Sequence, residues 1–377
     1  MPDGSALSAC PAAADRLTLT SAPGAPTAAP RRTDFVLRPF LERSDAIAAW
    51  QMANTLGPLA LLWWAALWSI DHRPWLLPPV LLLQVLFMAR CFSLMHDCGH
   101  GSLFRGRRAN RWAGFVFGIV AGIPQLPWSR GHAFHHRHNG DWEKYQGPSA
   151  LISTEAFAGL SPGSRRMYRW LRHPLMLFPG GFFYLVIKPR LQLLLGAVDL
   201  VAASIRRTPA SSPQRSRHWH SPAEGRDLAL NTLAVVAVWL LMGWQVGIGR
   251  FWIVYAPLMT MAAALFICVF FVQHNFPGSY AHRTEGWSSM AGVVDGTSDL
   301  DLPPLLHWFT ADIGCHAMHH LCDAIPNYRL RAAHDRNAAL LTGVRRLRLA
   351  DIAGCFDYIL WDPDAASLTT IAVQPPA

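Results

Sequence analysis

Three histidine clusters stand out in this chain of 377 residues. They are His96 and His100 in HDCGH, His132, His135 and His136 in HAFHH, and His316, His319 and His320 in HAMHH. An α-helix places residues three and four positions apart on one face, so each cluster can direct its imidazole rings toward one point. Neutral imidazole binds zinc, copper and iron, and these eight rings exceed what one tetrahedral zinc ion needs. The spacing therefore predicts a site for two metal ions.

His274 is a ninth candidate ligand. It begins HNFPGSY, directly after a long apolar stretch, although a histidine at this place could instead anchor a helix end at headgroup level. Histidine ligands also need a carboxylate or carbonyl group that holds the second ring nitrogen. Four aspartates are close enough in sequence for this role or, equally, for capping a helix: Asp97, Asp141, Asp312 and Asp323.

The elements that must carry these clusters are apolar. Hydrophobic residues make up 51% of the chain and charged residues 15%, with 16 Trp, which is typical of a membrane protein. Four stretches have about the length that a bilayer core requires, and very short connections join them in pairs: 52–70 with 74–95, and 228–247 with 251–273. The sequence therefore predicts an all-α integral membrane protein with four transmembrane helices in two hairpins.

Basic residues indicate how these hairpins are oriented. Residues 96–227 contain 18 Lys and Arg, whereas the two hairpin tips carry only Arg73 and Arg250. The positive-inside rule then places both termini and the histidine clusters in the cytoplasm, where a helical cap would hold the metal ions. The apolar segments 112–128 and 180–200 are interrupted by Gly, Pro or charged residues. We expect 112–128 to be a re-entrant or interfacial helix and 180–200 to lie along the membrane interface, and neither to span the membrane.

Composition divides the chain into three parts. Residues 1–33 are rich in Ala, Pro, Ser and Thr without periodicity, which predicts a disordered tail and not a signal peptide. Residues 34–340 form the membrane domain, and residues 341–377 form a cytoplasmic C-terminal segment. The net charge of +9 is spread over juxtamembrane loops, so we expect anionic lipid headgroups and no nucleic acid as partners. The seven Cys include no CxxC pair and are expected to be free thiols.

Several enzyme classes lack their motifs in this sequence. It contains no HExxH, no Walker A loop, no GxGxxG after a strand and no GxSxG. The bridging Glu and Glu-x-x-His pattern of soluble four-helix di-iron proteins is also missing. A metal transporter would need polar groups inside the spans, and these contain chiefly Asn54, Gln84, Asn231 and Gln245. A histidine-bound metal centre outside the spans fits the sequence better.

The three clusters and their placement relative to two helical hairpins resemble the membrane fatty acid desaturase family. The segments HDCGHGSLF, HHRHNGDWEKYQGP, VQHNFPGSY and WFTADIGCHAMHHLCDAIPNYRL are similar to bacterial acyl-lipid desaturases of the Δ12 and ω3 branch. The resemblance extends from about Asp34 to about Leu340. It implies that the eight clustered histidines and His274 hold two iron ions, with no catalytic residue beyond these ligands. For the polar residue that holds a metal-bound water in some relatives, the segment before His274 offers only Gln273.

The resemblance also implies a reaction. Reduced iron would bind O2 as co-substrate and remove hydrogen from two neighbouring methylenes of a fatty acyl lipid, giving a cis double bond and water. The sequence has no CxxCH haem motif and no four-Cys cluster, so a separate electron donor of the ferredoxin, rubredoxin or cytochrome b5 kind is expected. Membrane lipids are further partners, and the bacterial inner membrane is the expected location.

Two alternatives stay open at this point. The same histidine-bound di-iron architecture could hydroxylate or ketolate a lipid or a carotenoid, because a small shift of the substrate decides between oxygen transfer and a second hydrogen removal. The basic residues Arg105, Arg107, Arg108, Arg165 and Arg166 could form a docking site for an acidic electron donor, although positive-inside topology also explains them.

Overall fold

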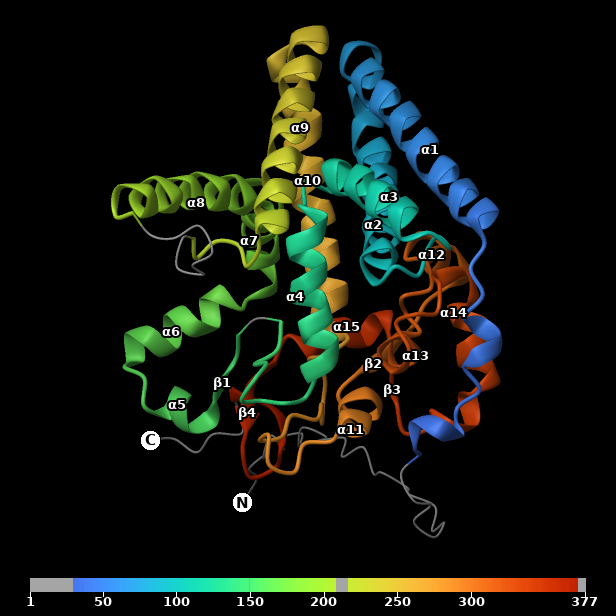
Figure 1. The fold of residues 1–377 in the computed structure, drawn as a ribbon, viewed down its shortest axis with the longest axis vertical. Coiled ribbons are helices and arrows are strands. Elements are labelled where there is room, and N and C mark those ends of the chain that lie inside the picture. Colours follow the sequence, from blue (N-terminus) through green and yellow to red (C-terminus); the bar gives the residue numbers. More distant parts are fainter. Residues whose placement is uncertain (1–29, 149, 208–215, 372–377) are drawn as a thin grey trace, which may run out of the picture.

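Four long helices form the upper half of the molecule (Figure 1). The structure is a computed structural model that describes residues 30–148, 150–207 and 216–371. The long helices are α1 (Asp45–His72), α2 (Leu77–His100), α9 (Pro222–Val246) and α10 (Ile248–Val272). Most of the predicted tail, residues 1–29, lies outside the described residues.

Local sequence explains where these helices begin and turn back. The Oγ of Ser44 accepts a hydrogen bond from the backbone N–H of Ile47 and begins α1. The short 3-10 helix η3 (Pro74–Leu76) connects α1 to α2. Gly247, with φ of +88°, connects α9 to α10, and this left-handed conformation favours glycine. Short connections therefore keep each pair of helices side by side (Figure 1).

Three helical segments among the described residues are long and apolar enough to cross a membrane: Pro74–His100, Pro222–Val246 and Ile248–Val272. They correspond to three of the four stretches expected from the sequence. The first expected stretch, 52–70, lies in α1, which has 28 residues but is not among the three. The mean hydropathy of this stretch is lowered by Trp63, Trp64 and Trp68 and by the polar Asn54.

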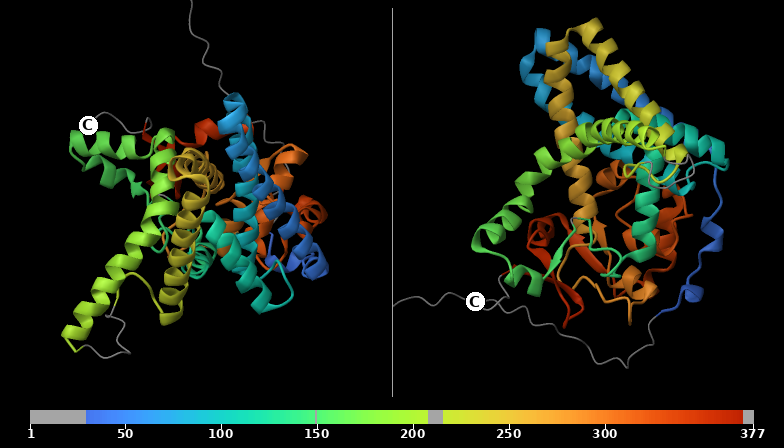
Figure 2. Two further views of the ribbon diagram at one scale, coloured as in Figure 1. Left: turned by 90° about the horizontal axis from the view of Figure 1, so that it is seen from above. Right: turned by 60° about the vertical axis from the view of Figure 1, so that its left-hand side comes forward.

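Two expected interfacial segments are built from more than one helix. The stretch 112–128 contains the end of α3 (Arg107–Ala121) and the beginning of α4 (Gln125–His138). Between them Gly122 has φ of +74°, and a Cβ there would lie 3.2 Å from the carbonyl oxygen of Leu185. The stretch 180–200 covers the end of α7 (Leu177–Phe182), the π-helix η5 (Phe183–Ile187) and most of α8 (Lys188–Ile205). Figure 2 shows α8 extending away from the long helices.

The lower half of the molecule, called the cap here, holds short helices and two small sheets (Figure 1). Its α-helices besides α4 are α5 (Thr154–Ala158), α6 (Pro162–Leu171), α11 (Ser289–Val294), α12 (Pro304–Phe309), α13 (His316–Leu321), α14 (Asn327–Arg336) and α15 (Ile352–Cys355). The remaining 3-10 helices among the described residues are η1 (Arg32–Asp34), η2 (Arg38–Phe40), η4 (Pro174–Met176), η7 (Ala338–Leu340) and η8 (Leu349–Asp351).

The sheets of the cap show that the all-α expectation was too simple. Strand β1 (Ile152–Ser153) pairs with β4 (Tyr358–Asp362), which pairs with β5 (Ser367–Thr370). Strand β2 (Ser298–Asp301) runs parallel to β3 (Arg345–Arg348). None of these strands exceeds 5 residues, which is too short for a clear two-residue hydrophobic period. The chain is therefore mostly helical, and its short strands lie in the cap.

A buried arginine joins the long helices to the cap. Arg90 of α2 is 2% exposed, and its Nε donates to the Oγ1 of Thr55 on α1 over 3.1 Å. Its Nη1 donates to the carbonyl oxygen of Trp308 at the end of α12, and the guanidinium lies 3.9 Å from the centroid of the Trp308 ring. A buried charge with these partners fixes α12 against α1 and α2.

Candidate metal centre

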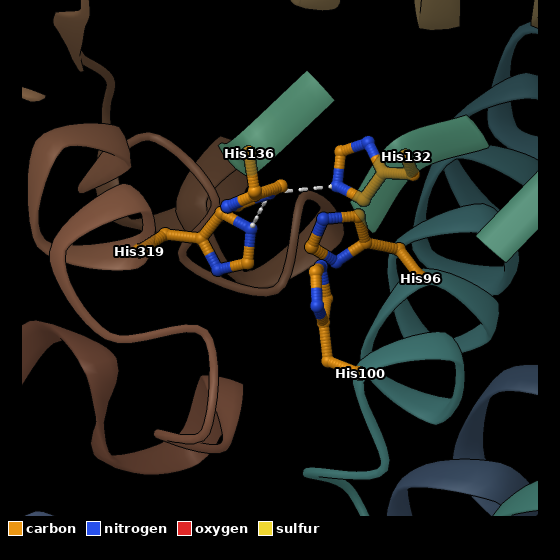
Figure 3. Close-up of side chains that lie close together, drawn as sticks. All are labelled: His96, His100, His132, His136 and His319. Atoms are coloured by element: carbon orange, nitrogen blue, oxygen red, sulfur yellow. Dashed lines mark hydrogen bonds between the residues drawn. The ribbon is translucent and has the colours of Figure 1, made fainter. Parts of the chain in front are cut away.

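All nine histidines singled out from the sequence meet at the junction of the long helices and the cap. Ligand nitrogens of His96, His100, His132, His136 and His319 lie within 4.8 Å of one another, and we call these residues the first group (Figure 3). His135, His274 and His320 form the second group by the same measure. The Nε2 of His316 lies 3.0 Å from the Nε2 of His274, so His316 adjoins the second group.

Helix geometry explains why two groups form. His96 and His100 are one turn apart at the end of α2, and their ring centroids are 4.7 Å apart. His132 and His136 are likewise one turn apart on α4, with their Nε2 atoms separated by 2.9 Å. Neighbouring residues of a helix point about 100° apart because one turn takes 3.6 residues. The two side chains of an adjacent pair therefore reach different groups.

Both adjacent histidine pairs follow this rule. His136 belongs to the first group, whereas His135 belongs to the second. On α13, His319 belongs to the first group and His320 to the second. Across the first group, the Nε2 of His319 lies 3.1 Å from the Nε2 of His136. The HAFHH and HAMHH segments therefore each contribute to both groups.

The ring nitrogens have the chemistry of metal ligands. Burial lowers the pKa well below the usual histidine value for His132, His135, His136, His316, His319 and His320. Burial also lowers the pKa of His274 to about 4. Neutral rings with free lone pairs are the form that binds metal.

Orphaned nitrogens support the same conclusion. Among the described residues, no hydrogen-bond partner exists for either ring nitrogen of His135 or His320, for Nε2 of His100 or for Nδ1 of His316. A buried polar atom without a partner costs about 1–3 kcal/mol, which a bound metal ion would relieve. The donor set therefore fits metal ions, and the two groups can hold them.

Two of the four expected aspartates hold ligand histidines. The Oδ1 of Asp97 lies 3.2 Å from the Nδ1 of His96, and Oδ2 of Asp323 lies 3.2 Å from Nδ1 of His100. The Oδ2 of Asp97 also accepts hydrogen bonds of 2.9 Å from the backbone N–H and the side-chain amide of Asn327. These contacts fix the orientation of both rings of α2.

The other two aspartates serve neighbouring segments. Asp141 accepts from the Oγ1 of Thr284 over 2.7 Å and pairs with Lys144 at 3.0 Å. Asp312 pairs with Arg331 at 3.0 Å. Neither contacts a histidine of the two groups, so of the alternatives left open by the sequence these two aspartates have a role outside the site.

Two groups near the second site could not be recognised from the sequence. The carbonyl oxygen of Gly296 lies 3.1 Å from the Nδ1 of His274. The Oδ1 of Asp299 accepts the backbone N–H of Ala317 over 3.0 Å, and Oδ2 accepts from Nε2 of His334 over 2.9 Å. Gly296 and Asp299 are more than a dozen residues before HAMHH, and His334 has no cluster spacing. No sequence signal pointed to them.

The remaining candidates lie at the edge of the site. Gln273 is 1% exposed, and its Nε2 donates to the carbonyl oxygen of Ile313 over 2.9 Å. Cys98 and Cys315 are buried but belong to neither histidine group. Burial raises the pKa of the Cys315 thiol, which disfavours the thiolate form that binds metal.

An apolar pocket lies directly beside His96. It is lined by Ala89, Phe92, Ser93, His96, Leu265, Phe266, Val269, Phe270, Gln273, Thr310 and Ile313. Its walls come from α2, α10 and the turn between α12 and α13. The rings of Phe92 and Phe266 stack with centroids 4.3 Å apart and close one side. An apolar ligand in this pocket would lie beside His96 of the first histidine group.

The pH dependence of stability offers a test of the His334 contact. The hydrogen bond to the Asp299 carboxylate raises the pKa of His334 above its usual value of about 6.5. Below about pH 6.5, His334 is protonated and its ion pair with Asp299 stabilises the fold fully. As the pH rises through the raised pKa of His334 in the folded protein, His334 loses its charge and the stabilisation from the ion pair is lost. We expect the difference in Tm between the wild type and His334→Gln to shrink over this range. A constant difference would contradict the charged pair.

Fold and site together define a class: a helical protein with helices long and apolar enough to cross a membrane and with histidine groups able to bind metal beside an apolar pocket. Comparison with known proteins identifies the family. The fatty acid desaturase family model matches residues 73–348, and the chain belongs to this family. The expectation drawn from the histidine motifs is thus confirmed.

Individual relatives agree with this assignment. The chain is 30% identical to a fatty acid desaturase of Bacillus subtilis (strain 168) over 83% of each chain. It is 25% identical to an sn-1 acyl-lipid omega-3 desaturase (ferredoxin) of Synechocystis sp., over 69% of this chain and 67% of that protein. It is also 24% identical to an sn-1 oleoyl-lipid 12-desaturase of Synechocystis sp., over 77% of this chain and 75% of that protein. Desaturation is therefore favoured over hydroxylation or ketolation.

Proposed function

We propose that this enzyme inserts a cis double bond into a fatty acyl chain of a membrane lipid, using O2 and two iron ions. The pocket beside His96 carries the proposal, because it can hold methylenes next to the first histidine group. Bound iron would supply the activation of O2 and the removal of two hydrogen atoms. Overall, one acyl –CH2–CH2– unit, O2, two electrons and two protons would give –CH=CH– and two water molecules.

The residues of the chain would perform three tasks in this reaction. The eight histidines of the two groups together with His316 would hold the irons, and Asp97 and Asp323 would orient His96 and His100. The apolar walls would exclude water and fix which methylene lies nearest His96. Because methylenes are chemically alike, position in the pocket would decide where the double bond forms.

Phospholipid-bound acyl chains are the proposed substrate. The pocket is built partly from α2 and α10, which are both apolar enough to span a membrane. An acyl chain could therefore enter from the bilayer without leaving an apolar environment. The relatives that are named as acyl-lipid and oleoyl-lipid desaturases support a lipid-bound acyl chain over a soluble thioester.

The electrons are proposed to come from a separate protein. A ferredoxin, rubredoxin or cytochrome b5-like donor would fit, and one relative carries ferredoxin in its name. The half-exposed side chain of Asp323 contacts His100 of the first group, so a donor bound near Asp323 would come close to the irons.

The topology is part of the same proposal. Helices α1, α2, α9 and α10 would span a bacterial inner membrane as two hairpins, with α8 along the interface. Exposed apolar side chains of α8, such as Leu194, Val198 and Val201, support that position. The basic residues of 96–227 support a cytoplasmic cap. Labelling of single cysteines introduced at Arg137 and Arg73 should find the first accessible only from the cytoplasm and the second only from outside.

Product analysis tests the proposed reaction. Expression in a bacterial host with a compatible electron donor should add an unsaturated acyl species to the phospholipids, and mass spectrometry of double-bond adducts would give its position. A variant with His135→Ala serves as the inactive control. An oxygenated lipid in place of the alkene would contradict desaturation, and a metal-dependent product in the His135→Ala cells would contradict the site.

A further inference from the structure

Strand β2 connects two segments that supply histidines to the second group. The backbone N–H of Ser298 donates to the carbonyl oxygen of Gln273 over 2.9 Å, and the Oγ of Ser298 donates to that of Val272 over 3.0 Å. These bonds fasten β2 to the end of α10, next to His274. On the other side, the N–H of Leu300 donates to the carbonyl oxygen of Gly314 over 2.9 Å, just before α13.

One charged side chain of β2 holds the beginning of α13. Asp299 is 5% exposed, and each of its oxygens has a partner. Oδ1 accepts the backbone N–H of Ala317, the residue after His316, and Oδ2 accepts from the Nε2 of His334 on α14. A hydrogen bond to a buried carboxylate is stronger and more directional than one between neutral groups. Asp299 therefore fixes the backbone from which His316 projects.

His334 in turn holds the Asp299 carboxylate. Its side chain is 12% exposed, and its Nδ1 lies 3.4 Å from the Oδ1 of Asp335, whose side chain is 69% exposed. Both ring nitrogens thus face carboxylates, which fixes the plane of the ring. The imidazole of His334 contacts no member of either histidine group and acts only through Asp299.

We propose that Asp299 and His334 are a positioning pair that sets the affinity of the second histidine group for its metal ion. This inference rests on the proposed site for two irons. His316 is the first residue of α13 and adjoins the second group through His274, so movement of this backbone would displace His316 most directly. The second group would be left with three histidines. The first group has five, four of which come from α2 and α4.

Metal binding by purified protein in detergent tests this proposal. We expect the wild type to bind two irons and Asp299→Ala to bind its second iron about 10–100-fold more weakly, the range found when an outer partner of a ligand is removed. Competition with a chelator under anaerobic conditions measures both affinities. Asp301→Ala is the matched control, because Asp301 lies on the same strand with an exposed side chain.

A spectroscopic signal distinguishes loss of one iron from general damage. A lone ferric ion gives an electron paramagnetic resonance signal, whereas a coupled ferric pair is silent, so partly loaded Asp299→Ala should gain that signal. Asp299→Asn keeps an oxygen for the N–H of Ala317 and should largely restore the second affinity. If Asp299→Ala does not fold, His334→Gln can replace it and should also lower the affinity for the second iron.

Separate outcomes decide the two claims. A wild type that binds no iron, or only one, contradicts the proposed di-iron function. A wild type with two irons together with an Asp299→Ala variant of unchanged affinities overturns the positioning role alone. Equal loss of both irons in Asp299→Ala, or the same loss in Asp301→Ala, also overturns it, because the effect would then not belong to the second group.

Discussion

Replacement of His319 by Ala is expected to abolish desaturation. His319 comes from α13 and completes a group whose other four members come from α2 and α4, and its Nε2 faces that of His136 at 3.1 Å. Loss of a direct ligand should exceed the roughly 100-fold upper range for loss of an outer partner. Double bonds formed per hour in membranes, together with iron content after purification, measure the effect.

The control for this prediction is His138→Ala. His138 lies on α4, two residues after His136, but its ring packs on Phe134 and belongs to neither histidine group. We expect this variant to keep both irons and most of its activity. If His319→Ala retains iron and turnover, or if His138→Ala loses both, the assignment of ligands is wrong.

A bulky side chain in the apolar pocket should stop the reaction without removing iron. Ala89 of α2 lines the same pocket as His96 and is 5% exposed, so Ala89→Phe would fill part of this pocket. A displacement of reacting groups by about 1 Å can cost about 100-fold in rate, and we expect at least this loss. We therefore expect turnover to fall in Ala89→Phe while its iron content stays at the wild-type value.

Ala60→Phe is the matched control for the pocket. Ala60 lies on α1 and is exposed in the structure, so a phenylalanine at this position does not occupy the pocket. Its turnover should equal that of the wild type. Wild-type turnover in Ala89→Phe, or loss of iron in that variant, would show that the pocket does not hold the reacting chain.

The sequence predicted that the clustered histidines would meet, because the spacing within each cluster is local. In HxxxH and HxxHH the histidines are three or four residues apart, which is about one turn of a helix. The helices that carry them, α2, α4 and α13, follow from the neighbouring residues. The apolar stretches likewise predicted α2, α9 and α10 from composition alone. Which cluster meets which is a long-range property, and the sequence did not show that His135 and His136 separate into two groups.

Other features depended on contacts that no local pattern encodes. Asp299, which reaches Ala317, lies on β2, and β2 is held by the end of α10, by Gly314 and by β3, whose residues lie more than 40 positions later in the chain. The turn at Gly122 depends on the close approach of Leu185. Strand β1 pairs with β4 and β2 pairs with β3 across distant segments, so the pattern of one segment could not predict these pairings.

The division of adjacent histidines between the two groups has a consequence for thermal motion. Neighbouring Cα atoms are about 3.8 Å apart, and covalent bonds keep this distance constant. His135 with His136, and His319 with His320, would tether the two irons to consecutive points of the same backbone. Thermal motion of the cap would then move the two irons together. A change in the distance between them would require α4 or α13 to unwind.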